Sequence, residues 1–391
     1  MRLSCTRNNG VYIKQNKKPF YIRDPVSGDL RLDDVIKDII ETQEFQRLRY
    51  VKQLGFAYLI FPGAHHTRFE HSLGTWNITK DISERMLGSE DVELSVAGLL
   101  HDIGHMAMSH ESETPMYKFT KMMHEEIGRR ILEKSPVLDK LSDYGLSRKK
   151  VIKYFDGIGK GKVVTGATGT DRLDYLMRDA YYTGVAYGII DYYRIRNLLT
   201  LYLDEPATYS NGIDAIESFF IARYYMYSSV YFHHAVIIAN GMYRKALKLA
   251  LESGEIDPKA FISYRDDEAI AKLSESKASG RLIGMIMERK LFKRAYYEPN
   301  FNGNITNEEL SAIAEKAGLD DSQYIAEVHP FKGNDESIRV ISKEMRELGD
   351  LRRTSSMFKI LTDVLEKRKV VVVACEQKYV KKLSAAIEKA L

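Results

Sequence analysis

The chain has 391 residues, of which 44% are hydrophobic and 29% are charged, and this composition excludes disordered and fibrous proteins. A formal net charge of +4 is small for this length and gives no reason to expect nucleic acid as a partner. The two cysteines, Cys5 and Cys375, exclude a disulfide framework, and no apolar run approaches the ~20 residues that span a bilayer. We therefore expect a cytoplasmic protein without a membrane partner.

The first part of the chain is predicted to be a short β element followed by helices. Residues 10–32 contain the segments VYIK, FYIRDP and LRL around turn-like sequences, which indicates a β-hairpin. From Asp33 onward, apolar residues recur at steps of three and four, the spacing of a helix with one buried face. Further helices are predicted near residues 66–87, 91–104, 124–134 and 170–187.

The middle and the end of the chain differ in their residue patterns. Residues 214–251 are rich in tyrosine and phenylalanine and are predicted to form one long, largely buried helix. The glycine-rich residues 156–170 are predicted to be a mobile loop, and their glycines lack the spacing of a phosphate-binding loop. After residue 254, the strand-like segments FKRAYYEP, QYIAEVH and KVVVVACE alternate with helical ones, which predicts a small α+β unit over residues 255–391. The expected fold class is mainly α.

Polar residues interrupt an apolar stretch, AGLLHDIGHMAMSH, at residues 97–110. If this stretch is helical, the side chains of His101, Asp102 and His105 can face one cavity. Adjacent ligands cannot complete the shell of a metal ion, so other parts of the chain must supply the rest. The segment HHTRFEHSLG offers His71, and TGTDRLDYLMRD offers carboxylates at helical spacing. Two imidazoles and two carboxylates suit Mn²⁺, Fe²⁺, Zn²⁺ or Mg²⁺ without choosing among them.

Each of these features also has a purely structural interpretation. A buried histidine is more often a hydrogen-bonded core residue than a ligand, and the spacing of Asp174 and Arg178 is typical of a surface ion pair. His65 and His66 are predicted to cap the start of a helix, without a catalytic role. Asp102 weakens the structural interpretation, because burying an unpaired carboxylate costs several kcal/mol and requires a strong partner.

The pattern H…HD…D, formed by His71, His101–Asp102 and Asp171, resembles that of the HD-domain metal-dependent phosphohydrolases. Three segments resemble one branch, the deoxynucleoside triphosphate triphosphohydrolases: FQRLRYVKQLGFAYLIFPGAHHTRFEHSLG, AGLLHDIGHMAMSH and TDRLDYLMRDAYYTGV. That branch includes bacterial dGTPase-like enzymes and a mammalian enzyme with a sterile-alpha-motif domain, which this sequence lacks. The resemblance covers residues 20–250 and implies an HD-domain helical core within residues 1–254.

The resemblance implies a metal site that holds one divalent transition ion, Mn, Fe or Zn, with Mg²⁺ accompanying the triphosphate. The implied ligands are His71, His101, Asp102 and Asp171. Besides Asp102, the implied catalytic residues are histidines that line the phosphates, namely His105, His110 and His124. Among them, His110 matches the proton donor to the leaving 5′-oxygen, and this role favours release of the whole triphosphate.

The resemblance also implies a set of residues that contact the phosphates and the sugar. They are Gln53, Leu54, Arg68, Arg172, Tyr175, Asp179, Arg223 and Tyr231. The three arginines can offset the roughly four negative charges of a triphosphate, and Arg172 replaces a lysine of the relatives. Asp179 matches an aspartate that binds the 3′-hydroxyl. Gln53 and Leu54 match a pair that reads this hydroxyl and closes the space that a 2′-hydroxyl would need.

The segment ETQEFQRLR resembles one that binds a guanine nucleotide at a subunit interface in some relatives. Glu41, Gln46 and Arg49 fall on the matching positions, which implies a nucleotide effector and a homo-oligomer, either a dimer or a tetramer. Phe20 and Arg23 stand where those relatives have lysine and asparagine. The alternative is that Gln46 and Arg49 are polar residues of a helix surface.

Three functions remain open from the sequence. The leading one is metal-dependent hydrolysis of deoxynucleoside triphosphates (dNTPs) to deoxynucleoside and inorganic triphosphate. The alternative is an HD phosphohydrolase that acts on a nucleoside monophosphate, a cyclic nucleotide or another phosphoester. The third is a nucleotide- or nucleic-acid-binding protein with a vestigial site, and the intact H…HD…D pattern argues against it.

Overall fold

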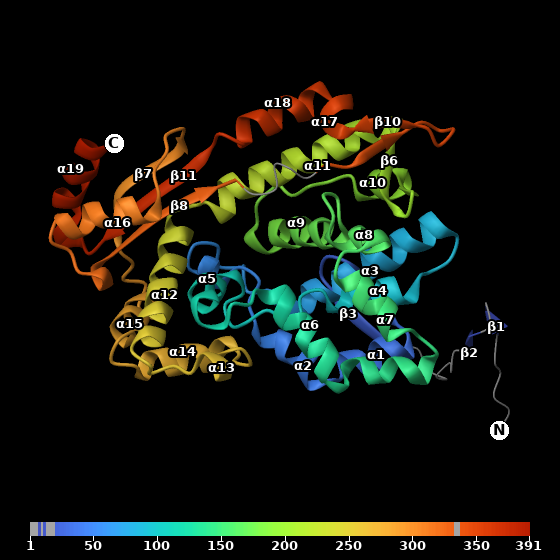
Figure 1. Ribbon diagram of the computed structural model, residues 1–391, viewed down its shortest axis with the longest axis horizontal. Helices are drawn as coiled ribbons and strands as arrows, with labels where there is room; N and C mark the ends of the chain where they lie inside the picture. Colours follow the sequence, from blue (N-terminus) through green and yellow to red (C-terminus); the bar gives the residue numbers. More distant parts are fainter. Residues whose placement is uncertain (1–6, 9–10, 13–19, 332–336) are drawn as a thin grey trace.

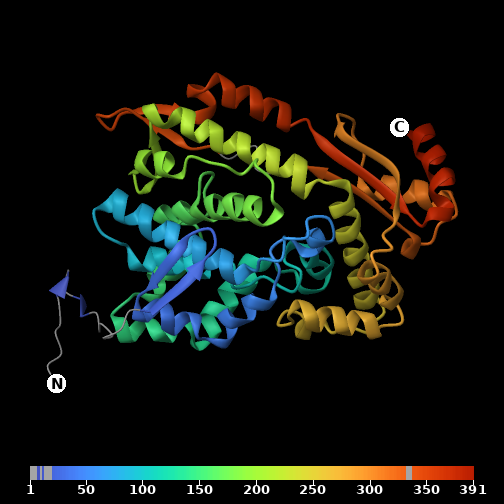
Figure 2. The same ribbon diagram turned by 180° about the vertical axis from the view of Figure 1, so that it is seen from behind.

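A computed structural model describes residues 7–8, 11–12, 20–331 and 337–391 (Figure 1). The chain is mainly α-helical with a few small sheets, as predicted. Strands β3 (Phe20–Asp24) and β4 (Gly28–Leu32) form an antiparallel hairpin within the predicted range 10–32. The short strands β1 (Arg7–Asn8) and β2 (Val11–Tyr12) also pair, and the rest of that range before Phe20 lies outside the described residues. Figure 2 shows the β3–β4 hairpin on the face of the helical core that points away in Figure 1.

The first hydrophobic core lies between that hairpin and the early helices, and Trp76 is fully buried in it. Its elements are α1 (Asp34–Ile40), α2 (Gln43–Gln46), α3 (Arg68–Leu87), α4 (Val92–Leu100), α6 (His124–Lys134) and α7 (Arg148–Phe155). Helix α3 begins with a capping box in which Glu70 accepts a hydrogen bond from the Thr67 backbone N–H at 2.6 Å, and it ends at Leu87, directly before Gly88. Gly88 has φ +76°, a left-handed conformation that favours glycine.

The predicted helix over residues 91–104 ends early, at Leu100. Beyond it the chain makes tight turns, in which Ile103 N donates to Leu100 O at 3.0 Å and His105 N donates to Asp102 O at 3.1 Å. The turns bury Ile103 and bring Gly104 against the backbone of α6, which a continuing helix would not do. Nine residues separate Leu100 from the next helix, α5 (His110–Thr120). His101, Asp102 and His105 therefore belong to a turn, contrary to the helical prediction.

Two other predictions of secondary structure are corrected. Residues 156–170, predicted to be a loop, contain α8 (Lys162–Thr165), whose Val163 and Val164 are buried in a second core. The predicted long helix 214–251 is two helices, α11 (Ile213–Met226) and α12 (His234–Glu252), joined by a wider π-type turn over residues 227–231. Figure 1 shows α12 leaving at a steep angle to α11, so each helix packs into a different part of the protein.

The C-terminal sheet is a three-stranded antiparallel sheet in the order β7-β11-β8. It consists of β7 (Lys293–Phe301), β8 (Tyr324–Pro330) and β11 (Lys369–Cys375). Helices α16 (Asn307–Lys316) and α19 (Val380–Ala390) cover one face, and α12 lies on the other. Alternate β11 residues enter different cores, Val371 and Val373 on one side and Val370 and Val372 on the other. Burial on both faces explains the unbroken apolar run of this strand.

Other residues after 254 pack back onto the helical body. Helices α13 (Pro258–Phe261), α14 (Asp266–Glu275) and α15 (Gly280–Met287) lie beside α12 and α5. A second sheet, in the order β10-β9-β6-β5, joins β5 (Leu199–Tyr202) and β6 (Glu205–Tyr209) to β9 (Arg339–Ile341) and β10 (Glu347–Asp350). After it, α17 (Leu351–Thr354) and α18 (Ser356–Leu365) follow, and α18 packs against α11.

The division of the chain after residue 254 stays a prediction, and these contacts cross it. Among the described residues, no helix is long and apolar enough to cross a membrane.

Candidate active site

Three of the four residues predicted to hold a metal, His71, His101 and Asp171, form one cluster of possible ligands, and Asp102 lies beside it. His71 lies on α3, His101 and Asp102 follow α4, and Asp171 lies in the first turn of α9 (Thr170–Thr183). His71 Nε2 is 3.1 Å from His101 Nε2 and 3.1 Å from Asp171 Oδ1, and Asp102 Oδ1 is 3.3 Å from His101 Nε2. Donor atoms that share an ion at ~2.1 Å lie roughly 3.0–3.4 Å apart, so this donor set fits a divalent metal.

The Nδ1 atoms of His71 and His101 each take part in a hydrogen bond within the protein. His101 Nδ1 lies 2.8 Å from the Gly98 carbonyl oxygen, and His71 Nδ1 lies 2.8 Å from Asp174 Oδ2. Each ring therefore donates through Nδ1 and presents the lone pair of Nε2 to the shared point. Burial disfavours a charge on His71, yet Asp171 and Asp174 outweigh it and raise the pKa of His71 to about 10. Without a metal, the charge that these carboxylates favour is a proton on Nε2, and a divalent cation would replace this proton and bind the Nε2 lone pair.

A buried chain of charges supports His71 from behind. Asp174 accepts a hydrogen bond from Arg178 Nε at 2.8 Å, and Arg178 NH1 donates to Asp24 Oδ2 at 2.7 Å. Asp174 and Arg178 are fully buried, which excludes the alternative interpretation as a surface ion pair. Asp24, which comes from β3, was not among the predicted residues, because its contact with Arg178 spans 154 residues.

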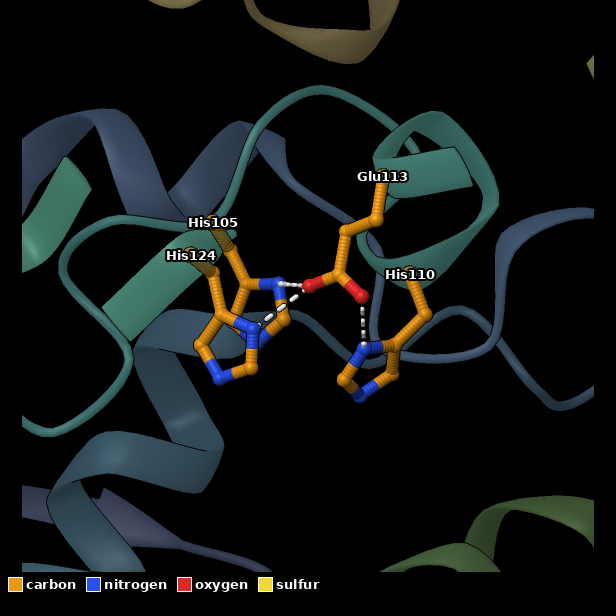
Figure 3. Close-up of side chains that lie close together, drawn as sticks. All are labelled: His105, His110, Glu113 and His124. Atoms are coloured by element: carbon orange, nitrogen blue, oxygen red, sulfur yellow. Dashed lines mark hydrogen bonds and ion pairs between the residues drawn. The ribbon is translucent and has the colours of Figure 1, made fainter. Parts of the chain in front are cut away.

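The three predicted phosphate-lining histidines meet around a carboxylate that the sequence analysis missed (Figure 3). Glu113 Oε1 is 2.5 Å from His124 Nδ1, and Glu113 Oε2 is 3.1 Å from His110 Nδ1. The rings of His105 and His124 stack with centroids 4.0 Å apart and an interplanar angle of 13°. The one sequence signal for Glu113 is its position one helical turn after His110 on α5. These four side chains could also hold a metal ion.

The environment separates the pKa values of two stacked histidines. Burial, Arg68 and His124 hold the pKa of His105 well below its usual range. Burial opposes a charge on His124 as well, but the hydrogen bond and charge of Glu113 raise its pKa. His105 is therefore neutral at neutral pH while His124 favours the charged form, and such divergence is typical of acid–base sites.

Arg68 connects the two histidine groups. Its NH1 donates to Asp102 Oδ2 at 2.6 Å, and its Nε donates to Ser109 Oγ at 2.9 Å. Burial would raise the pKa of Asp102, but Arg68, His101 and His105 together hold it well below its usual range. Arg68 is thus the strong partner that a buried Asp102 requires.

A second group of predicted residues forms a wall along α9 and the π-type turn that follows α11. Tyr231 donates its hydroxyl hydrogen to Asp179 Oδ2 at 2.6 Å, and the rings of Tyr231 and Tyr175 meet edge-on at 6.4 Å. Asp179 Oδ1 also lies 2.8 Å from Nε2 of His66, whose ring stacks on Tyr182. His66 was predicted to cap α3; Thr67 and Glu70 form the cap instead, and His66 is buried against Asp179.

The two remaining arginines lie close together beside this wall. Burial and then the neighbouring Arg223 guanidinium lower the pKa of Arg172, whose NH1 donates to the Ala167 carbonyl at 3.1 Å. Burial opposes a charge on Arg223, but the charges and hydrogen bonds of Tyr175 and Tyr227 raise the pKa of Arg223, so this guanidinium keeps its charge. Leu54 packs on the same hydrophobic cluster as Tyr175 and Tyr231. Next to Leu54, the buried Gln53 Oε1 has no hydrogen-bond partner among the described residues, so it remains able to bind a ligand.

The three residues of the predicted effector site lie on the surface around α1 and α2. Arg49 Nε donates to Gln46 Oε1 at 2.8 Å, and Arg49 lies 3.5 Å from the centre of the Phe69 ring. Glu41 is exposed and lies 4.0 Å from Lys37 Nζ. These contacts do not test the effector, which stays a prediction.

Two sequence families match the chain. Residues 68–175 match the family described as HD domain, and residues 190–391 match the one described as HD associated region. The first match contains His71, His101, Asp102 and Asp171, and the second begins just after α9.

Individual proteins are also similar. Uncharacterized protein MJ1154 of Methanocaldococcus jannaschii is 38% identical over 287 residues, 71% of this chain and 61% of that protein. The deoxynucleoside triphosphate triphosphohydrolase SAMHD1 homolog of Dictyostelium discoideum is 28% identical over 330 residues, 75% of this chain and 63% of that protein. The chain thus spans about three fifths of each of these relatives. The crystal structure of a hypothetical protein from Aquifex aeolicus has a TM-score of 0.78 at 31% identity, over 95% of this chain and 100% of that one.

Proposed function

The chain belongs to the HD-domain phosphohydrolases that carry an HD-associated region, and we propose that it hydrolyses deoxynucleoside triphosphates to deoxynucleoside and inorganic triphosphate. One observation carries the choice of substrate. Asp171, Tyr175 and Asp179 recur every four residues along one face of α9, a span of about 12 Å. A phosphate bound at the Asp171 end would place its nucleoside along the tyrosine wall, with the sugar toward Asp179.

The phosphates would lie among the cationic side chains. Arg68, Arg172 and Arg223 supply three positive charges, which offset most of the roughly four negative charges of a triphosphate. His105 and His124 add nitrogens that can donate hydrogen bonds to phosphate oxygens. A divalent ion held by His71, His101, Asp102 and Asp171 would neutralise further charge and activate water near neutral pH.

The departure of the nucleoside depends on a proton. Glu113 holds Nδ1 of His110 at 3.1 Å and leaves Nε2, on the other side of the ring, to face the substrate. The His110 side chain is 59% exposed, so a bound nucleotide can reach it. Protonation of the 5′-oxygen by His110 makes deoxynucleoside the leaving group and releases inorganic triphosphate intact.

At the sugar, Asp179 would accept the hydrogen bond of the 3′-hydroxyl, because its carboxylate is fixed by Tyr231 and His66. Gln53 would bind the same hydroxyl through its unpaired Oε1, and Leu54 would fill the space beside C2′. A nucleotide effector at Glu41, Gln46 and Arg49 and a dimeric or tetrameric assembly remain predictions within this proposal.

The test is analysis of the products by ³¹P NMR with each dNTP, alone and in mixtures, with Mn²⁺ or Mg²⁺ added. We expect inorganic triphosphate together with deoxynucleoside, and turnover confined to mixtures would indicate an effector. The folded variant Asp102→Ala, which removes a predicted ligand, should give neither product. Orthophosphate, pyrophosphate or an unchanged substrate from the wild-type protein would reject the proposal in favour of a monophosphate, a cyclic nucleotide or another phosphoester.

A further inference from the structure

A buried carboxylate outside the HD domain binds two segments of the active site at once. Asp266, the first residue of α14, is 5% exposed and lies in the HD-associated region. Its Oδ2 accepts a hydrogen bond from Lys52 N at 2.8 Å, and its Oδ1 accepts one from Met108 N at 2.7 Å. These contacts span 214 and 158 residues of sequence. Both oxygens of one carboxylate thus join two chain segments that are otherwise far apart in sequence.

The first segment is the substrate loop, residues 51–54. Lys52 immediately precedes Gln53 and Leu54, the pair proposed to contact the sugar. The Lys52 peptide is held on both sides, because its carbonyl oxygen accepts a hydrogen bond from Ser109 Oγ at 2.6 Å. A shift of Lys52 would therefore move the next two side chains directly.

The second segment is the catalytic turn, residues 106–110. Met108 and Ser109 have φ of +57° and +55°, a left-handed conformation that costs non-glycine residues free energy. Such strain persists only where surrounding contacts impose it, and the bond from Met108 N to Asp266 is one of those contacts. Helix α5 begins with His110 directly after these residues, so their conformation sets the direction of the His110 side chain.

We propose that Asp266 is a positioning residue that fixes the substrate loop against the catalytic turn, and through them the spacing between the sugar contacts and His110. The roles of those two segments rest on the function proposed above. Asp266 itself touches no substrate. It is one of the points at which the HD-associated region contacts the active site, since Arg223 and Tyr231 also lie in that region.

Burying an ionised carboxylate at Asp266 is costly, so the stability of the fold alone does not explain this residue. Burial raises the pKa of Asp266 to about 6, although the two backbone N–H groups, Lys52 and Arg47 lower it. Tyr58 and Tyr243 of α12 also lie close enough to be affected by its charge, while Glu268 on the same helix acts on Arg47. A neutral residue would be easier to bury, but only the ionised carboxylate accepts a hydrogen bond on each oxygen with no proton of its own to place.

The experiment compares Asp266→Asn with Asp267→Asn, which changes the exposed neighbouring residue in the same helical turn. Hydrogen exchange is followed in peptides covering residues 50–56 and 106–112, together with the melting temperature and dNTP turnover. We expect Asp266→Asn to speed exchange at Lys52 and Met108 by at least tenfold and to lower kcat/KM by at least tenfold. The melting temperature and the exchange elsewhere should stay unchanged, and Asp267→Asn should match the wild type. Faster exchange throughout with a lower melting temperature, or no local change, would overturn the proposal.

The wild-type protein provides a second test that does not depend on the variant folding. The amides of Lys52 and Met108 should lose protection as the pH falls through 6, after correction for the intrinsic exchange rate. The amide of Phe56 is a matched control, because it donates to the non-titrating Asn240 Oδ1 at 3.0 Å and should stay protected. Equal behaviour of the three amides would refute the role of Asp266. Absence of dNTP turnover in the wild type would instead refute the proposed function, so the two failures are distinguishable.

Discussion

The orientation of His71 depends on residues that are not themselves predicted metal ligands. Asp174 Oδ2 lies 2.8 Å from both His71 Nδ1 and Arg178 Nε, and Arg178 continues the chain to Asp24 of the β3–β4 hairpin. Burial would raise the pKa of Asp174, but Arg178 and His71 lower it, so the carboxylate stays ionised. An ionised Asp174 keeps the Nδ1 proton on His71 and leaves Nε2 as an electron-pair donor.

The Asp174→Asn variant should weaken binding of Mn²⁺ by about 10- to 100-fold, because an amide cannot hold His71 as a carboxylate does. Titration calorimetry on metal-depleted protein measures this affinity. Asp214→Asn, at an exposed position in α11, is the control and should bind Mn²⁺ as the wild type does. An unchanged affinity in Asp174→Asn would contradict the supporting role of this chain of charges.

At the scale of elements, the active site depends on how closely the turn after α4 approaches α6. A Cβ atom on Gly104 would lie 2.0 Å from the His124 carbonyl oxygen and 2.3 Å from Gly128 N. Two backbones therefore meet where only glycine fits. This approach places His124, the first residue of α6, against the ring of His105, so the histidine stack depends on the packing of two elements.

We expect Gly104→Ala to lower the free energy of unfolding by about 1–3 kcal/mol, because the added methyl group must push two backbones apart. Turnover should also fall, since the His105–His124 stack opens. Gly284→Ala is the control, because a Cβ there meets nothing within 4 Å in the interior of α15, and alanine should add up to about 1 kcal/mol. Urea unfolding measures both, and equal stability of the two variants would refute the close approach.

At the scale of the whole molecule, a partly buried ionic network ties the C-terminal sheet to α12 and α5. Arg244 of α12 pairs with Glu327 of β8 and with Glu111, the residue after His110. His329 Nε2 lies 2.9 Å from Glu327 Oε2. Burial would raise the pKa of Glu327, but Arg244 and then His329 lower it to about 2. The sheet is thus linked to α5 by ion pairs that weaken when Glu327 becomes protonated.

A depressed pKa in the folded state gives a stability that is present above the ordinary pKa of Glu327 and is lost as the pH falls toward 2. The wild type should therefore lose up to about 3 kcal/mol of unfolding free energy between pH 4.5 and 2 through this group. Glu327→Gln should lose that stability already at pH 7 and show a shallower decline below pH 4.5. Urea unfolding from pH 7 to 2 measures this, with exposed Glu275→Gln as the control; parallel curves for Glu327→Gln and the wild type would contradict it.

The sequence by itself determined the family, the mainly α-helical fold and the three strands of the C-terminal sheet. The recognition of an HD-domain phosphohydrolase is confirmed by the matching families and relatives. Such features are encoded locally, in residue types a few positions apart: His101–Asp102 in one motif, or the apolar run of β11. The predicted roles of the site residues remain predictions, although His71, His101, Asp102 and Asp171 do lie together.

Only the tertiary structure decided where helices end and which charges are buried. Local periodicity continued the helix past Leu100 and joined α11 to α12, because the reasons for those breaks lie in distant packing partners. The same holds for buried partners such as Asp24, His66 and Asp266, whose contacts reach across 113 to 214 residues. A carboxylate or an imidazole has the same chemistry at the surface and in the core. Its charge, its hydrogen bonds and its role are set by the atoms that folding brings around it.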